Sequence, residues 1–156
     1  MCNSVNLNCQ NSKLKICYWN IHGHKSETIP NKLVDREFLE KLKNSDIVAI
    51  SETHTQNKDL SIPGYTLVKE KIRVKQNKGP KISGGLAVFV KDYLYRSVHV
   101  VPNTNENTIW LKLKPKDTKI SEDIYIGSFY VSPDNQCAQV RQLDVFWTSS
   151  RPNRSP

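Results

Sequence analysis

Short apolar runs, each ended by polar or turn-forming residues, recur along the whole chain. Such runs predict β-strands, and a run without polar positions predicts a strand that is buried on both faces. We therefore expect a fold made mostly of β-sheet. The expected strands span Leu14 to Ile21, Ile47 to Ile50, Tyr65 to Val74, Leu86 to Val90, Ser97 to Val101, Thr108 to Leu113 and Ile124 to Val131.

One helix is expected between the first two strands, from Thr28 to Lys43. Val34, Phe38 and Leu42 recur there every four residues and define one apolar face. A strand, a helix and a second strand in this order predict a right-handed crossover between parallel neighbours. The carboxyl ends of the two strands should then lie at one edge of the sheet.

Each of these two strands ends in polar residues. Asn20 lies at the end of the first strand, and Glu52 follows Ser51 at the end of the second. Ligands bind beyond the carboxyl ends of strands in α/β sheets, so Glu52 lies where a metal-binding or catalytic carboxylate would be placed. The alternative is a carboxylate that ends a strand and points into water.

Length and composition predict a single domain with irregular ends. A chain of 156 residues suffices for one domain with a core. Residues 1–13 are rich in Asn, Ser and Cys and predict a disordered leader, and residues 14–133 carry the domain. Residues 134–156 predict an irregular tail, in which a short helix from Ala138 to Trp147 is the alternative.

The four cysteines include no C-x-x-C pair, which argues against a zinc site. Their layout favours a reducing, intracellular location, either the cytoplasm or the nucleus. No apolar run is long enough to cross a bilayer, so we expect no membrane partner. The sequence also indicates no obligate protein partner.

The net charge of +8 favours partners that carry phosphate, and DNA is one of them. Lys71, Arg73 and Lys75 would share one face of a strand, and Lys78 and Lys81 would follow in a loop. Contact with the phosphate backbone of a nucleic acid is one interpretation of this run. The other is a basic edge that prevents strands of different molecules from pairing.

Four motifs occur in an order that resembles the endonuclease/exonuclease/phosphatase superfamily, over Leu14 to Pro133. They read W-N-I-H-G, S-E-T-H, G-G-L-A-V-F-V and F-Y-V-S-P. Their order and spacing are most similar to the amino-terminal part of the endonuclease domain of non-LTR (LINE-type) retrotransposon proteins. Four motifs in order are far more specific than any one of them.

The resemblance implies an α/β fold, an incomplete endonuclease/exonuclease/phosphatase-type α/β sandwich with mostly one mixed β-sheet and a helix packed on it. It implies Mg²⁺-dependent hydrolysis of DNA phosphodiesters. By this resemblance Glu52 is the metal ligand, Asn20 orients the metal site, and Tyr130 reaches the scissile phosphate. Without it, Tyr130 would be a strand-end tyrosine with a packed ring and a hydrated hydroxyl.

The later motifs of that family, an Asp-x-Asn and a closing Ser-Asp-His, do not occur in the sequence. We therefore expect a truncated relative with weak or absent Mg²⁺ binding and no activity by itself. Most of the second sheet would also be missing, which would expose an apolar face of the first. The alternatives are a non-catalytic basic nucleic-acid-binding module and an unfolded remnant of a mobile element. Phosphatases and lipid-headgroup hydrolases share the fold as well.

Four further residues are assigned by pattern alone. His22, His24 and His54 lie near the expected site, and we interpret them as surface or loop residues rather than ligands. Trp110 lies within an expected strand and is predicted to belong to the core.

Overall fold

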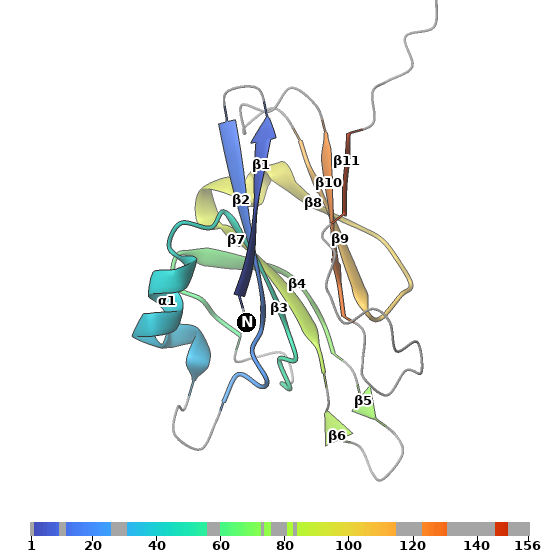
Figure 1. The fold of residues 1–156 in the computed structure, drawn as a ribbon. Helices are drawn as coiled ribbons and strands as arrows, with labels where there is room; N and C mark the ends of the chain where they lie inside the picture. Colours follow the sequence, from blue (N-terminus) through green and yellow to red (C-terminus); the bar gives the residue numbers. More distant parts are fainter. Residues whose placement is uncertain are drawn as a thin grey trace, which may run out of the picture.

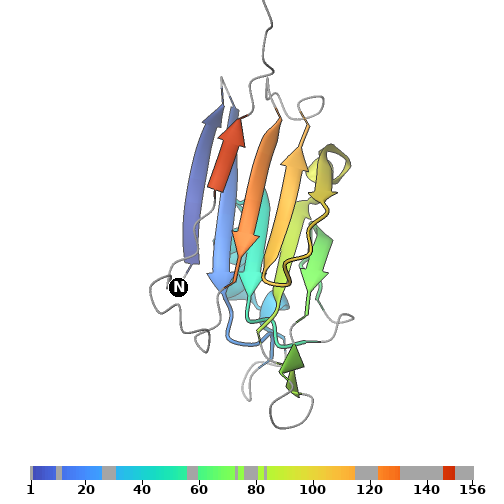
Figure 2. The ribbon, with the colours of Figure 1, turned by 90° about the vertical axis from the view of Figure 1, so that its right-hand side faces the viewer.

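The fold is a mixed α/β structure dominated by β-sheet, as the sequence predicts. The computed structural model describes residues 2–9, 12–25, 31–55, 60–72, 74–75, 81–82, 84–114, 123–130 and 146–149. Within these residues a helix lies against one sheet, and a second sheet covers the other face of that sheet (Figures 1 and 2).

The first sheet has five strands in the order β1-β2-β3-β7-β4. The second has four strands in the order β11-β10-β9-β8, and β5 pairs with β6 separately. The strands of the first sheet are β1 (Cys2–Cys9), β2 (Ser12–Asn20), β3 (Ile47–Ser51), β4 (Tyr65–Lys71) and β7 (Leu86–Lys91). The other strands are β5 (Val74–Lys75), β6 (Lys81–Ile82), β8 (Val98–Val101), β9 (Thr108–Leu113), β10 (Ile124–Phe129) and β11 (Phe146–Ser149).

The parallel pairing of β2 and β3 is confirmed. Ile16 lies opposite Ile47 at the start of the pair, and Asn20 lies opposite Ser51 at its end. Every residue of β3 is buried because it is covered on both faces. Ile47 and Ala49 belong to the core between the sheets, whereas Val48 and Ile50 belong to the core under the helix.

The helical segment is shorter than predicted. A 3₁₀ turn, η1 (Lys32–Val34), precedes α1 (Arg36–Leu42), and residues 28–30 of the predicted helix lie outside the described residues. Asp35 separates η1 from α1 because its backbone is extended and its carboxylate accepts a hydrogen bond from the Phe38 amide at 3.1 Å.

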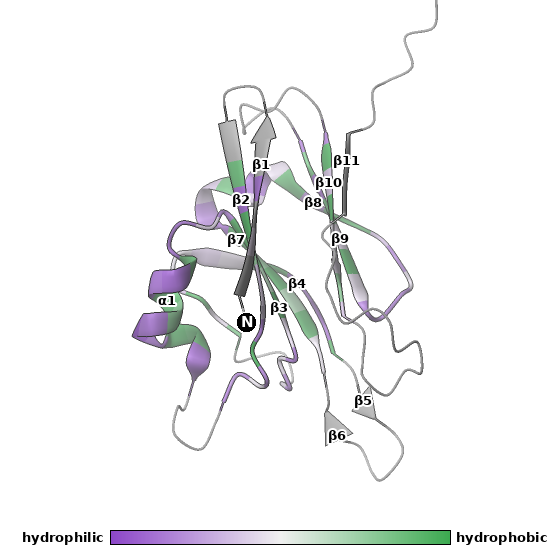
Figure 3. Ribbon diagram, in the orientation of Figure 1, coloured by the Kyte–Doolittle hydropathy of each residue, from purple (hydrophilic) through white to green (hydrophobic). Residues whose placement is uncertain are grey.

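This interruption changes which residues face the sheet. Phe38 and Leu42 are buried as predicted, but Val34 is 51% exposed and Leu33 is fully buried instead. Val34 does not share the buried face of Phe38 and Leu42, because the extended backbone of Asp35 separates it from the α-helix. Figure 3 shows mainly hydrophilic residues on α1, whereas hydrophobic residues concentrate on the strands.

Both predicted irregular ends contain strands. Residues 2–9 form β1, antiparallel to β2, and residues 146–149 form β11, antiparallel to β10. The predictions of a disordered leader and an irregular tail are therefore wrong for these residues, because the open edges of β2 and β10 supply backbone hydrogen-bond partners. The alternative helix ends inside β11 and otherwise lies outside the described residues.

The second sheet is present, contrary to the expectation of mostly one sheet with an exposed apolar face. Alternate residues of β9 and β10, among them Ile109, Leu111 and Ile126, pack against β2, β3 and β7. Trp110 is not in the core as predicted, because the same alternation places it on the outer face. It lies there edge-to-face with Phe129, with ring centroids 5.4 Å apart.

Two smaller features complete the fold. The 3₁₀ turn η2 (Asp92–Ser97) interrupts the chain between β7 and β8, at the predicted break. The loop expected to carry Lys78 and Lys81 contains β6, which pairs with β5, and residues 76–80 lie outside the described residues. Among the helices of the described ranges, none is both long and apolar enough to span a membrane.

Tyr65 connects β4 to the end of the helix and provides a test of this packing. Its hydroxyl lies 2.6 Å from the Leu42 carbonyl oxygen and 2.7 Å from that of Ser45. Tyr65→Phe should lower the free energy of unfolding by about 1–2 kcal/mol, because it removes the hydroxyl that donates to this helix end. Tyr95→Phe, at an exposed position on η2, is the control and should have little effect in urea denaturation.

The same hydroxyl should make stability depend on pH. Burial, together with the negative charge of Asp46, raises the pKa of Tyr65 from 10.0 to about 12. The folded state therefore holds this proton more tightly than the unfolded state. The contribution is fully present below pH 10 and is lost as the pH rises through about 12. An equally steep loss of stability in Tyr65→Phe would contradict this assignment.

Candidate active site

The loops that follow β2 and β3 remain paired beyond the ends of the strands. The amides of Ile21, Gly23 and His24 donate to the carbonyls of Ser51, Glu52 and Thr53 at 3.1, 2.6 and 3.1 Å. The two loops therefore form a continuous backbone ladder, and the side chains that they carry have fixed relative positions.

Three residues without the freedom of glycine adopt positive φ in these loops. The φ angles are 47° at His22, 54° at Glu52 and 49° at His54. This left-handed conformation is uncommon for residues with a side chain and costs about 1–3 kcal/mol at each position. Conformations of this kind persist where surrounding structure holds them, and they are concentrated at ligand-binding and catalytic sites.

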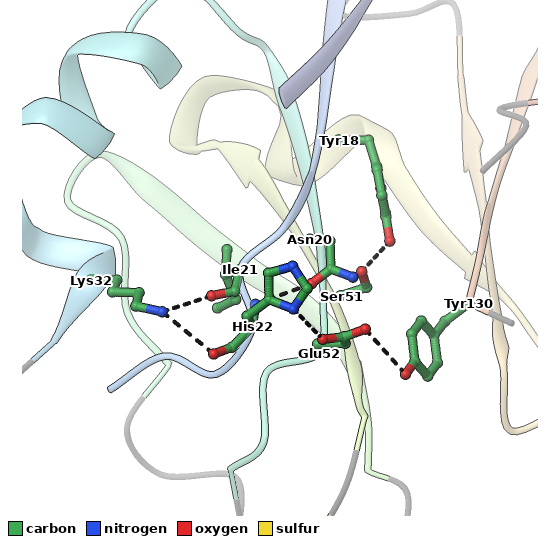
Figure 4. Close-up of polar contacts among 8 residues, drawn as sticks. All are labelled: Tyr18, Asn20, Ile21, His22, Lys32, Ser51, Glu52 and Tyr130. Atoms are coloured by element: carbon green, nitrogen blue, oxygen red, sulfur yellow. Dashed lines mark hydrogen bonds and ion pairs between the residues drawn. The ribbon is translucent and has the colours of Figure 1, made fainter. Parts of the chain in front are cut away.

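The carboxylate of Glu52 lies between groups from both sheets (Figure 4). Its Oε2 atom is 2.8 Å from Nδ1 of His22, and its Oε1 atom is 3.5 Å from the hydroxyl of Tyr130. The Glu52 side chain is only 16% exposed, whereas that of His22 is 76% exposed. Glu52 therefore does not simply end a strand and point into bulk water.

Asn20 lies beside this carboxylate and acts on the backbone. Its Oδ1 atom accepts a hydrogen bond from the His22 amide at 3.0 Å, which closes the turn after β2. Figure 4 shows Asn20, His22 and Glu52 as neighbours. Asn20 thus orients the residue that contacts the carboxylate.

Tyr130 reaches the site from the second sheet, directly after β10. It is buried, and its amide donates to the Asn107 carbonyl at 2.8 Å. Gly84 makes room for the ring, since a Cβ atom there would lie 2.8 Å from Cε1 of Tyr130. The structure therefore brings together Asn20, Glu52 and Tyr130, the three residues that the sequence singled out for catalysis.

A buried pair of hydroxyl groups lies under the site. The hydroxyl of Tyr18 donates to Oγ of Ser51, the residue that precedes Glu52. Burial raises the pKa of Tyr18 well above its usual value, and the nearby Glu52 and Tyr130 raise it further. Tyr18 thus stays neutral and supports the backbone just before the carboxylate.

Sequence reasoning missed Tyr18, Ser51 and Gly84. It interpreted His22 as a surface or loop residue, and His22 is exposed, but its contact with Glu52 was not foreseen. The signal for Gly84 was the Gly-Gly pair directly before an apolar strand, and the signal for Ser51 was its place at a strand end. Nothing local marks Tyr18, because its partner lies 33 positions away in the sequence.

The other histidines are placed differently from each other. Both lie in loops, as expected, but His54 is exposed whereas His24 is buried rather than at the surface. Nδ1 of His24 lies 3.1 Å from the Thr53 carbonyl oxygen, which holds the ring inside the paired loops.

The donor atoms fit a hydrated magnesium ion. Mg²⁺ keeps several waters and binds through one or two carboxylates rather than through a full protein cage. Glu52 provides one carboxylate at the rim of the site. Within the described ranges, no group of three or more His, Cys, Asp and Glu residues is placed to hold a metal.

The basic residues do not share one strand, because β4 ends at Lys71 and Lys75 belongs to β5. The ammonium of Lys71 donates to Oδ1 of Asn103 at 2.7 Å and to the Asn105 carbonyl, which ties β4 to the loop before β9. Lys75 lies opposite Lys81 across the β5–β6 pair. Arg73 and Lys78 lie outside the described residues.

Comparisons with known proteins do not assign this site. No model of a protein family matches the chain, and neither the curated proteins nor the solved structures give a match.

The hydroxyl pair under the site can be tested by a double-mutant cycle. Tyr18→Phe and Ser51→Ala should each lower the free energy of unfolding by about 1–3 kcal/mol, because each leaves a buried hydroxyl without its partner. The double variant should lose less than the sum of the two, since neither hydroxyl is then left alone. Chemical denaturation measures all four corners, and strictly additive losses would show that the pair does not interact.

Proposed function

We propose that this site belongs to a Mg²⁺-dependent phosphodiesterase that acts on DNA, and that the chain carries its metal-binding part. The observation that supports this most strongly is the position of Glu52. Its carboxylate is held between a histidine of one sheet edge and a tyrosine hydroxyl from the other sheet. The four ordered motifs of the sequence favour the same chemistry.

Each residue has a role that its position allows. Glu52 would hold the cation, which when bound neutralises phosphate charge and polarises a phosphoryl oxygen. Tyr130 points its hydroxyl at the Glu52 carboxylate and can donate to a phosphate oxygen placed beside it. Asn20 fixes the turn that borders the site.

The net charge of +8 favours a polyanionic substrate over a small neutral one. DNA satisfies this requirement, and its backbone supplies the phosphodiester that such a metal site cleaves. We propose slow or undetectable cleavage by this chain alone, because the Asp-x-Asn and Ser-Asp-His motifs, which supply further groups in the resembled family, do not occur in it.

Metal-dependent DNA binding tests the site directly. Mg²⁺ should increase the affinity for a short DNA duplex, because a cation held by Glu52 would neutralise phosphate charge. Glu52→Gln keeps the size of the side chain and should abolish this Mg²⁺-dependent gain while preserving the affinity measured in EDTA. Glu37→Gln, at an exposed position on α1, is the control and should behave as wild type. Fluorescence anisotropy measures all three proteins.

An equal Mg²⁺ effect in wild type and Glu52→Gln would contradict the proposal. Plasmid nicking in Mg²⁺ provides the second measurement, and we expect none from the wild-type chain. Nicking that disappears in Glu52→Gln would support the site and overturn the expected inactivity.

A second candidate, a non-catalytic nucleic-acid-binding module, is favoured by the β5–β6 pair. Lys75 and Lys81 lie directly opposite each other in its register. Both positions belong to the basic run for which the sequence predicts contact with a phosphate backbone.

This candidate predicts a specific change in salt dependence. Replacing both Lys75 and Lys81 with Gln should weaken DNA binding and reduce the slope of log affinity against log salt by about 2, which corresponds to two lost phosphate contacts. Replacing Lys41 and Lys43 on α1 removes the same charge and should leave the slope nearly unchanged. Equal effects of the two double variants on DNA binding would show that only the net charge of the protein matters. That result would exclude the candidate.

A further inference from the structure

His22 is the most exposed side chain of the site, and it directly contacts the proposed metal ligand. Nδ1 of His22 lies 2.8 Å from Oε2 of Glu52, although 76% of the histidine side chain is exposed to solvent. A histidine so exposed could turn freely into water. Its ring instead lies against the carboxylate (Figure 4).

The two donor atoms have the separation of neighbouring ligands on one cation. Bonds from a divalent cation to imidazole nitrogen or carboxylate oxygen are about 2.0–2.2 Å long, so two ligands at right angles lie about 3 Å apart. The nitrogen of His22 and the oxygen of Glu52 are 2.8 Å apart. A small displacement of the histidine ring would admit a cation between them.

The backbone holds both residues in this arrangement. The amide of Gly23, the residue after His22, donates to the Glu52 carbonyl at 2.6 Å. Lys32 donates to the carbonyl oxygens of Ile21 and His22 at 2.8 and 3.4 Å and so fixes the turn from the other side. With Asn20 on the His22 amide, the turn is held at three points.

The cost of this arrangement argues that the pair has a role. Both His22 and Glu52 have positive φ, at 47° and 54°, and glycine would relieve the strain at either position. An exposed histidine contributes little to folding through burial. Strain at two facing residues with donor side chains is characteristic of a ligand clamp.

We propose that His22 is the second protein ligand of the metal site and that it shifts the preference of the site from Mg²⁺ towards divalent first-row transition ions. The proposal rests on the metal site of the proposed function and deepens it. Mg²⁺ prefers oxygen ligands, whereas imidazole nitrogen binds transition ions more favourably. A pair made of one imidazole and one carboxylate therefore discriminates between the two classes of ion.

Substitutions at His22 must respect its backbone. Asn and Gly both tolerate positive φ, so His22→Asn and His22→Gly should fold. Asn replaces the nitrogen donor with an amide that offers oxygen to a metal, and Gly removes the donor altogether. His99→Asn, on the exposed face of β8, is the matched control for loss of a histidine.

The experiment titrates each protein with Mn²⁺ and with Mg²⁺ alone, without DNA. Wild type and His99→Asn should bind Mn²⁺ more tightly than Mg²⁺. His22→Gly and His22→Asn should lose most of this preference, and His22→Asn should retain the affinity for Mg²⁺. Pulsed electron paramagnetic resonance of bound Mn²⁺ should show a directly coordinated nitrogen in wild type and none in His22→Gly.

Two outcomes separate the failure of this inference from that of the proposed function. In the first outcome, His22→Gly binds Mn²⁺ as tightly as wild type or more tightly, while Glu52→Gln still loses binding. His22 would then only form a hydrogen bond to the carboxylate and would not be a metal ligand. That result would overturn the inference and leave the metal site intact. Binding of both ions that is unaffected in Glu52→Gln would overturn the proposed function itself.

Discussion

The parallel pairing of β2 with β3 is the constraint on which the rest of the site depends. It places Asn20 beside Ser51, and the backbone ladder continues past both strand ends to Glu52 and His24. Because β3 is buried on both faces, this register is strongly fixed: a shift by one residue would exchange the faces of all its side chains. The position of the Glu52 carboxylate is therefore a consequence of core packing.

The two sheets provide the other half of the site. Apolar residues of β9 and β10 pack against β2, β3 and β7, and this packing brings Tyr130 to the end of β3. Gly84 leaves the space that its ring occupies. The site thus lies at a boundary between layers, where polar groups from both sheets can converge while the core beneath stays apolar. The buried hydroxyls of Tyr18 and Ser51 satisfy each other at this boundary.

The local strain in the loops connects structure with proposed chemistry. His22, Glu52 and His54 all adopt left-handed backbone conformations in the two paired loops. The folded core must offset this cost, which is substantial in a domain whose whole stability is only about 5–15 kcal/mol. The side chains of two of these residues, His22 and Glu52, contact each other. This pairing supports a site built to hold a ligand.

The sequence by itself determined the central strands of both sheets, the parallel β2–β3 unit and the place of Asn20 and Glu52, because these follow from local periodicity and from the handedness of short connections. Only the tertiary structure decided that residues 2–9 and 146–149 pair as strands, that Trp110 faces outward, and that His22 and Tyr130 contact Glu52. These features depend on which sheet edge is open and on how two sheets pack. Such long-range contacts leave no periodic signal in the sequence.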